Sequence, residues 1–101
     1  MINLIKEASL KSLGQRLKNA RLKRDETQKE FAARMGVSIP TLYKMERGDA
    51  SIPIGRWAEA LWLLDRIDDL NNLLAPEKSL FDQYEMQAQV KKQRQRASKK
   101  T

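Results

Sequence analysis

The sequence predicts an all-α protein, and two observations carry that prediction. Apolar residues recur at three- and four-residue steps in successive short segments, which is the spacing of one face of an α-helix. Residues that start or stop helices stand between these segments, including Thr27, Gly36, Ser38 and Gly48. At 101 residues, the chain is long enough for one small domain and too short for a large enclosed active site.

The first predicted helix runs from about Leu10 to Arg24, which leaves residues 1–9 as an N-terminal extension. Its apolar residues fall on one side of a helix, namely Leu10, Leu13, Leu17 and Ala20. Asp25 and Glu26 end this helix without a glycine.

Two short helices follow, one on either side of Gly36. Thr27 is a good N-cap for the second helix, and Glu30 three residues later completes a capping box. The buried stripe of this helix consists of Phe31, Ala32 and Met35. Gly36 supplies the positive φ that favours a sharp helix end, and Ser38 then caps the third helix through the N–H of Thr41.

The third helix, residues 38–47, has two contrasting sides at about 100° per residue. One side carries Leu42, Met45 and Glu46. The outward side carries polar, basic and aromatic residues, namely Pro40, Tyr43, Lys44 and Arg47. Pro40 is tolerated because it lies in the first turn, where its missing N–H has no intrahelical partner to lose.

Gly48 closes the third helix, and two more helices are predicted at about 53–64 and 67–74. The core-facing stripe of the fourth consists of Ile54, Trp57, Ala58, Leu61 and Leu64, and the fifth offers Leu70, Leu73 and Leu74. Trp62 lies beside the stripe, and two roles stay open for it, completion of the monomer core or part of a dimer contact. The helical domain therefore spans residues 10–76.

Residues 77–101 form a C-terminal extension in this reading. Ser79 with Asp82 is expected to cap a sixth helical segment over 79–90. The basic tail, residues 91–101, has no apolar periodicity and is expected to be disordered when unbound. Three roles stay open for this tail, a solubilising segment, a nonspecific DNA arm or a segment that folds onto a partner.

Charge is distributed unevenly along the chain, which carries a net charge of +7. Residues 10–48 sum to +6 and residues 79–101 to +4, whereas residues 49–78 between them sum to −3. A basic surface favours polyanions such as nucleic acid. The acidic zone should face away from DNA, toward a second subunit or another protein.

The residue types argue against an enzyme or a metal protein. The chain contains no Cys and no His, which excludes thiolate ligands and sulfur nucleophiles, and no phosphate-cradling glycine loop is present. We expect no catalytic residue, metal or cofactor. The longest apolar run, residues 60–64, is far shorter than a membrane span, and the first ten residues lack a secretion signal, so we expect a cytoplasmic, nucleoid-associated protein.

Two capped helices around a glycine-centred turn, between a basic helix and an amphipathic one, form a helix-turn-helix pattern. The stretches "TQKEFAARMGVS" and "TLYKMERG", together with Arg21, resemble the Xre/Cro family of phage-repressor-like DNA-binding domains over about residues 12–75. The resemblance implies a five-helix lambda-repressor-like domain, a homodimer with two-fold symmetry, and a third helix that lies in the major groove of double-stranded DNA. It also implies an ion pair between Arg21 and Glu46 that locks the first helix to the third.

The sequence predicts a set of DNA-binding residues. These are Gln28, Lys29, Ser38, Ile39, Pro40, Thr41, Tyr43, Lys44 and Arg47. Gln28, Thr41 and Arg47 match phosphate-binding positions, while Ile39, Pro40 and Lys44 match base-reading ones. Ile39 and Pro40 cannot form bidentate hydrogen bonds, although Ile39 can rest against a thymine methyl, so Lys44 is the best candidate to hydrogen-bond guanine. Tyr43 either reaches a phosphate or covers the stem of a neighbouring Lys or Arg.

Two features depart from or extend this resemblance. Asp25 and Glu26 replace the usual glycine and apolar residue, which is expected to loosen that corner and to place negative charge near the DNA. The acidic stretch "LWLLDRIDDLNNLLAP" with its basic tail resembles, more weakly, HipB-like regulators encoded beside HipA-type kinase toxins. The sequence therefore predicts a repressor and antitoxin that binds operator DNA and a toxin. A phage or mobile-element repressor and a protein-interaction module without operator binding remain as alternatives.

Overall fold

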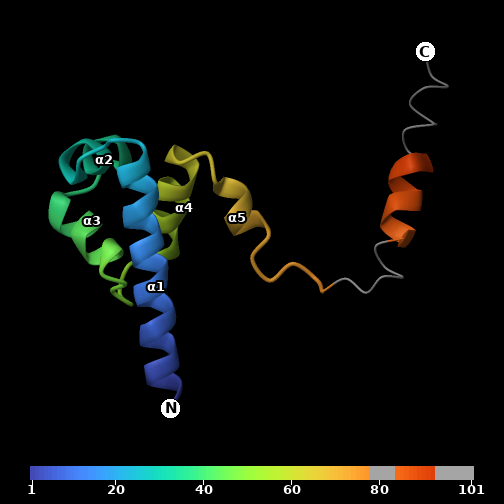
Figure 1. The fold of residues 1–101 in the computed structure, drawn as a ribbon, viewed down its shortest axis with the longest axis horizontal. Helices are drawn as coiled ribbons and strands as arrows, with labels where there is room; N and C mark the ends of the chain where they lie inside the picture. Colours follow the sequence, from blue (N-terminus) through green and yellow to red (C-terminus); the bar gives the residue numbers. More distant parts are fainter. Residues whose placement is uncertain (78–83, 93–101) are drawn as a thin grey trace.

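The computed structural model describes residues 1–77 and 84–92 of the chain, and these residues form helices joined by turns, with no strand among them. The elements in chain order are α1 (Ile2–Lys23), α2 (Gln28–Met35), α3 (Ile39–Glu46), α4 (Ile54–Leu63), α5 (Ile67–Asn71) and a further helix over residues 84–92 (Figure 1). The predicted all-α fold is confirmed. Across these described ranges, no helix has the length and apolar character needed to cross a bilayer.

The helices pack around one small core. α3 contacts both α1 and α2, while α4 contacts α2 and α5. The core side chains are Leu17, Phe31, Ala32, Met35, Leu42, Met45, Ala60 and Leu64. The stripe predicted for the second helix is therefore buried as expected. Burial of these apolar side chains against each other holds helices of eight to ten residues that would be marginal alone.

α1 begins at Ile2, well before the predicted start near Leu10. The prediction followed the apolar residues that face the core, and these begin only at Leu10. Residues 1–9 contain neither Gly nor Pro, so nothing in their sequence stops the helix. In Figure 1 this N-terminal part of α1 projects beyond the other helices, and its side chains are exposed.

The corner after α1 is held by two side-chain contacts, contrary to the expectation that it would be loose. The Arg21 Nη1 group donates a hydrogen bond to the Glu26 carbonyl oxygen at 2.8 Å. The Glu26 carboxylate forms an ion pair with Arg34 of α2. Asp25 adopts a φ of 57°, in the left-handed region that Asp tolerates better than most residues. Asp25 thus takes a conformation that glycine adopts most readily.

The turn between α2 and α3 follows the predicted caps. The Thr27 side chain accepts a hydrogen bond from the Glu30 N–H at 3.1 Å, and the reciprocal bond of the capping box is also present. Gly36 ends α2 with a φ of 74°. The Thr41 N–H donates to the Ser38 hydroxyl at 3.2 Å, which caps α3. These local signals fix the direction in which α3 leaves the turn.

The predicted stripe of the fourth helix is partly wrong. Ile54 is 64% exposed because it stands in the first turn of α4, beyond the reach of the core. Ala60 is fully buried instead, where a small side chain allows α4 to approach α2. Trp62 is 68% exposed, which excludes the first of the two roles left open for it, completion of the monomer core. α5 ends at Asn71 rather than near Leu74.

The C-terminal part agrees with the sequence only in outline. Within the described residues, the helix predicted over 79–90 covers residues 84–92, so Lys91 and Lys92 belong to it and not to the tail. All of its residues are exposed. The predicted cap at Ser79 and Asp82 and the remaining tail, residues 93–101, lie outside the described residues.

Candidate nucleic-acid interface

The two sides of α3 differ as predicted. Leu42 and Met45 are 0% exposed and Glu46 is buried, so this side faces the core. The opposite side consists of exposed residues, namely Ile39, Pro40, Tyr43, Lys44 and Arg47. Because three buried side chains fix the rotation of the helix about its axis, the exposed residues keep a defined direction. We call this exposed side, with the first turn of α2, the α3 surface.

Two glycines allow α3 to lie close against α1. A Cβ at Gly14 would lie 2.6 Å from the carbonyl oxygens of both Met45 and Glu46. A Cβ at Gly48 would lie 2.5 Å from the carbonyl oxygen of Leu10, and Gly48 also has a φ of 79°. Such approaches are closer than any side chain permits. The crossing of α1 with the C-terminal end of α3 is therefore a backbone-to-backbone contact.

A buried ion pair adds a polar link across the same crossing. Arg21 Nε lies 2.7 Å from Glu46 Oε2, and Arg21 Nη2 lies 3.1 Å from Glu46 Oε1. Arg21 is 5% exposed and Glu46 is 7% exposed. Two parallel charge-assisted bonds of this kind constrain geometry as well as adding energy. The pair sets the position of α3 relative to α1.

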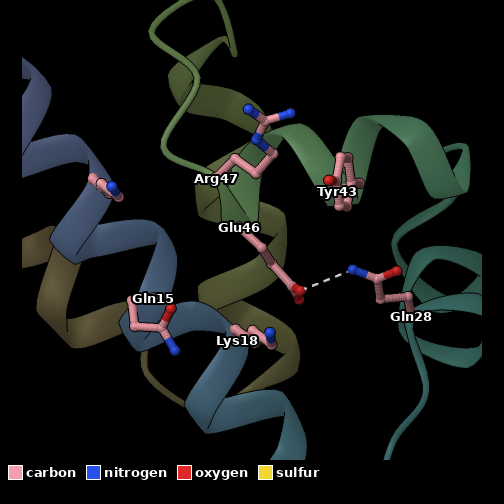
Figure 2. Close-up of a pocket in the computed structure, with 7 residues that line it drawn as sticks. Gln15, Lys18, Gln28, Tyr43, Glu46 and Arg47 are labelled. Atoms are coloured by element: carbon pink, nitrogen blue, oxygen red, sulfur yellow. Dashed lines mark hydrogen bonds between the residues drawn. The ribbon is translucent and has the colours of Figure 1, made fainter.

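Gln28 joins this pair from the start of α2. Its Nε2 group donates to Glu46 Oε1 at 3.0 Å, the bond drawn in Figure 2. One of its two amide N–H groups thus donates within the protein, and the other is available to an acceptor outside it. The N–H groups of Gln28 and Lys29 lie in the first turn of α2, where a helix offers no carbonyl acceptor. The helix start is consequently suited to an anion.

Local side-chain contacts order the exposed residues near each end of α3. The Arg47 guanidinium lies over the Tyr43 ring, 5.5 Å from its centroid. This cation–π contact holds Arg47 while leaving its donors available. At the other end, the Ser38 and Thr41 hydroxyl oxygens are 2.8 Å apart. The Tyr43 ring therefore contacts the guanidinium of Arg47, and this contact is compatible with a bond from the Tyr43 hydroxyl to a phosphate.

A half-open hollow of about 540 Å³ lies between α1 and α3 (Figure 2). Its lining residues are Lys11, Gln15, Lys18, Gln28, Tyr43, Glu46 and Arg47. In Figure 2, Gln15 and Lys18 come from α1 on one side and Gln28 from α2 on the other. We call it the α1–α3 hollow.

Lys11, Gln15 and Lys18 were absent from the set of residues predicted to bind DNA. Two signals were present in the sequence. The spacing i, i+4, i+7 places the three on one face of α1. Gly14 and Gly48 indicate that this face runs beside the end of α3, but that proximity becomes visible only in the fold.

Asp49 lies in the loop after α3 and carries an exposed negative charge near Lys44 and Arg47 in the sequence. Hydrogen bonds from the Ser51 hydroxyl and then from the Ser51 N–H, at 2.8 Å, lower the pKa of the Asp49 carboxyl below its ordinary value of 3.8. Lys44 and Arg47 lower this pKa further, while desolvation opposes them. The loop after α3 therefore keeps a charged carboxylate at neutral pH.

Hydrogen-bond donors dominate the chemistry of this surface. Lys and Arg side chains, amides and helix-start N–H groups suit phosphates and the acceptor atoms of bases. Within the described residues, no group of three acidic side chains lies close enough together to hold a metal ion.

An all-α domain in which a basic, outward-facing helix follows a capped helix and a glycine-centred turn is a helix-turn-helix domain. Residues 17–60 match the family model described as "Helix-turn-helix". This match supports the general Xre/Cro-like family that the sequence resembles, and with it a DNA-binding transcriptional regulator that acts on double-stranded DNA. A search of curated proteins found no match. The matched segment begins within α1, so Lys11 and Gln15 precede it.

Proposed function

We propose that the protein is a sequence-specific transcriptional repressor that binds a two-fold symmetric operator as a homodimer in the cytoplasm. The observation that carries this proposal is the division of α3. One side is locked into the core by Leu42, Met45 and the paired Glu46, and the other presents Tyr43, Lys44 and Arg47 to solvent. A rigid helix with such a face suits the major groove, which admits an α-helix.

The exposed residues divide into two groups by chemistry. Lys44 donates to guanine, and Ile39 and Pro40 offer apolar contact to a thymine methyl. Phosphates are bound by the remaining set, which consists of Gln28, Lys29, Ser38, Thr41, Tyr43 and Arg47. Base contacts supply the sequence preference and phosphate contacts fix the position of the domain on the duplex. Repression follows when the bound dimer occludes a promoter.

The dimer is supported by apolar side chains that the described chain leaves exposed around α4 and α5. Trp62, Leu73 and Leu74 are all exposed. Burial of these residues against the same residues of a second copy would remove apolar surface from water. A two-fold axis there would set the two α3 helices on half-sites about 34 Å apart. The exposed acidic residues Asp65 and Asp68 stand in the same region, where distance from DNA avoids repulsion.

Selection from a pool of random duplexes, followed by footprinting of the enriched sequence, tests this function. The proposal requires enrichment of a two-fold symmetric site that full-length protein protects from cleavage. Lys44→Ala should lose preference for that site, whereas Lys6→Ala, on an exposed turn of α1, should keep it. Failure to enrich any sequence would contradict operator binding and would favour a protein-interaction module.

We propose in addition that the regulator belongs to a toxin–antitoxin operon. The support is the acidic stretch around α5 followed by basic residues, the pattern that resembles regulators encoded beside HipA-type kinase toxins. The adjacent reading frame should then encode a kinase-like protein that co-purifies with this chain. A neighbouring frame without such a protein would assign the repressor to a phage or mobile element instead.

A further inference from the structure

We propose that the α1–α3 hollow binds a phosphate group of the DNA backbone, with Lys11, Gln15 and Lys18 of α1 as its donors. This inference rests on the proposed function, because the backbone reaches the hollow only when α3 lies in the major groove. It adds a contact outside the two helices of the helix-turn-helix. Neither Lys11 nor Gln15 falls within the segment that matches the family model.

The charges of the hollow select an anion. Lys11, Lys18 and Arg47 bring three positive charges to its wall. Gln15 and Gln28 add amide groups, each of which donates one N–H within the protein, to Asn19 and Glu46, and has a second N–H to offer. The one carboxylate in the lining, Glu46, is already bound by Arg21 and Gln28 and is buried. A phosphodiester carries one negative charge and only acceptors at its free oxygens, so it complements this set. A metal cation would be repelled.

The position of the hollow suits the backbone of a duplex bound by α3. Three of its lining residues, Gln28, Tyr43 and Arg47, also belong to the α3 surface. The hollow is therefore continuous with the residues proposed to bind phosphates. A backbone that passes Arg47 and Gln28 meets the exposed ammonium groups of Lys11 and Lys18 on the facing wall.

The tight crossing already described holds the backbone of α1 that carries these donors. The Cα atom of Lys11 lies 2.6 Å from the position that a Cβ of Gly48 would occupy. Lys11 is thus fixed next to the Arg47–Gly48 end of α3. Gln15 flanks Gly14, which lies under the carbonyl oxygens of Met45 and Glu46. This preorganisation reduces the entropy lost when the hollow closes on a phosphate.

The first test measures the salt dependence of DNA binding by the full chain. Fluorescence anisotropy would follow two duplexes, the selected site and a scrambled sequence, over about 50 to 200 mM NaCl. The double variant Lys11→Gln/Lys18→Gln is compared with the matched control Lys6→Gln/Lys23→Gln. The control removes the same charge from α1, but its residues lie far from the face of Lys11 at about 100° per residue.

Loss of the contact with one phosphate should lower the slope of log K against log salt by about 1, with roughly tenfold weaker binding to both duplexes. The control should keep the wild-type slope within about half a unit. Lys11→Arg/Lys18→Arg, which retains the charge, should restore binding. Equal slopes for the double variant and the control would overturn the inference while leaving the proposed function intact. Thermal melting followed by circular dichroism checks that each variant is folded.

The second test separates the hollow from the proposed function. Inorganic phosphate is titrated into ¹⁵N-labelled protein at constant ionic strength, and the side-chain amide signals of Gln15 and Gln28 are followed. A saturable shift that the double variant loses and the control keeps supports a phosphate site. If the wild type binds no duplex, the proposed function fails. The phosphate titration alone then decides whether the hollow is a phosphate site. Absence of any saturable shift in that case overturns the inference.

Discussion

Gln28 Nε2 lies 3.0 Å from Glu46 Oε1, and this bond connects a residue proposed to bind phosphate with a buried ion pair. Glu46 therefore has two partners, Arg21 from α1 and Gln28 from α2. Three helices meet at one carboxylate. The start of α2 and the outward face of α3 consequently have fixed positions relative to each other. Simultaneous contact of both with a rigid duplex requires such fixed positions.

Replacement of Glu46 by Ala should lower the free energy of unfolding by roughly 3 to 5 kcal/mol, because Arg21 would stay buried without its partner. Urea denaturation measures this change from the shift in midpoint at constant slope. The matched control is Glu59→Ala, which breaks the exposed ion pair with Arg56. An exposed pair of this kind contributes about 0 to 1 kcal/mol. Similar losses for the two variants would contradict the role assigned to Glu46.

The helix-turn-helix was the most predictable part of the molecule, because its signals are local. Thr27, Gly36 and Ser38 each act within three or four residues, and the structure follows them. The rotation of α3 could also be predicted, since its apolar and polar residues separate cleanly at 100° per residue.

Features that depend on contacts between distant segments were harder to predict. Ile54 satisfies the helical period but lies beyond the core, and Ala60 is too small to mark a buried face in the sequence. The hollow was missed because Lys11 and Arg47 meet only through the glycine crossing of α1 and α3. The start of α1 was missed because the prediction began at the residues that face the core, although Met1, Leu4, Ile5 and Ala8 already have helical spacing.

Two glycines should respond in opposite ways to replacement by Ala. Gly14→Ala would place its Cβ against backbone carbonyls, and these cannot move without separating α1 from α3. We expect a loss of about 1 to 3 kcal/mol from overpacking. Gly55→Ala in α4 meets open space and should gain about 0.5 to 1 kcal/mol from its higher helix propensity. Thermal or urea unfolding of both variants measures the difference, and a gain in the Gly14 variant would refute the tight crossing.

Ser51→Ala should raise the pKa of Asp49 part of the way toward 3.8, because the hydroxyl donor is lost and the Ser51 N–H remains. In the wild type the folded-state pKa is lowered, so the stabilisation is present above 3.8 and is lost as the pH falls through the lowered value. An NMR titration of the Asp49 carboxyl carbon checks both points. Ser12→Ala, which removes a hydroxyl from α1, should leave the titration unchanged. A midpoint at or above 3.8 in the wild type would disprove the bond.

Lys44 and Arg47 should differ in what their removal does to DNA binding, although both are exposed on α3. Lys44→Ala should cost about 1 to 3 kcal/mol of discrimination between the selected site and a scrambled duplex, because its contact is to a base. Arg47→Ala should weaken binding to both duplexes by a similar factor and reduce the salt slope by about 1, because its contact is to a phosphate. Anisotropy titrations of both duplexes at several salt concentrations separate these effects. If Lys44→Ala instead weakened binding to both duplexes equally, Lys44 would not contact a base. The base contacts would then be assigned to the apolar residues Ile39 and Pro40.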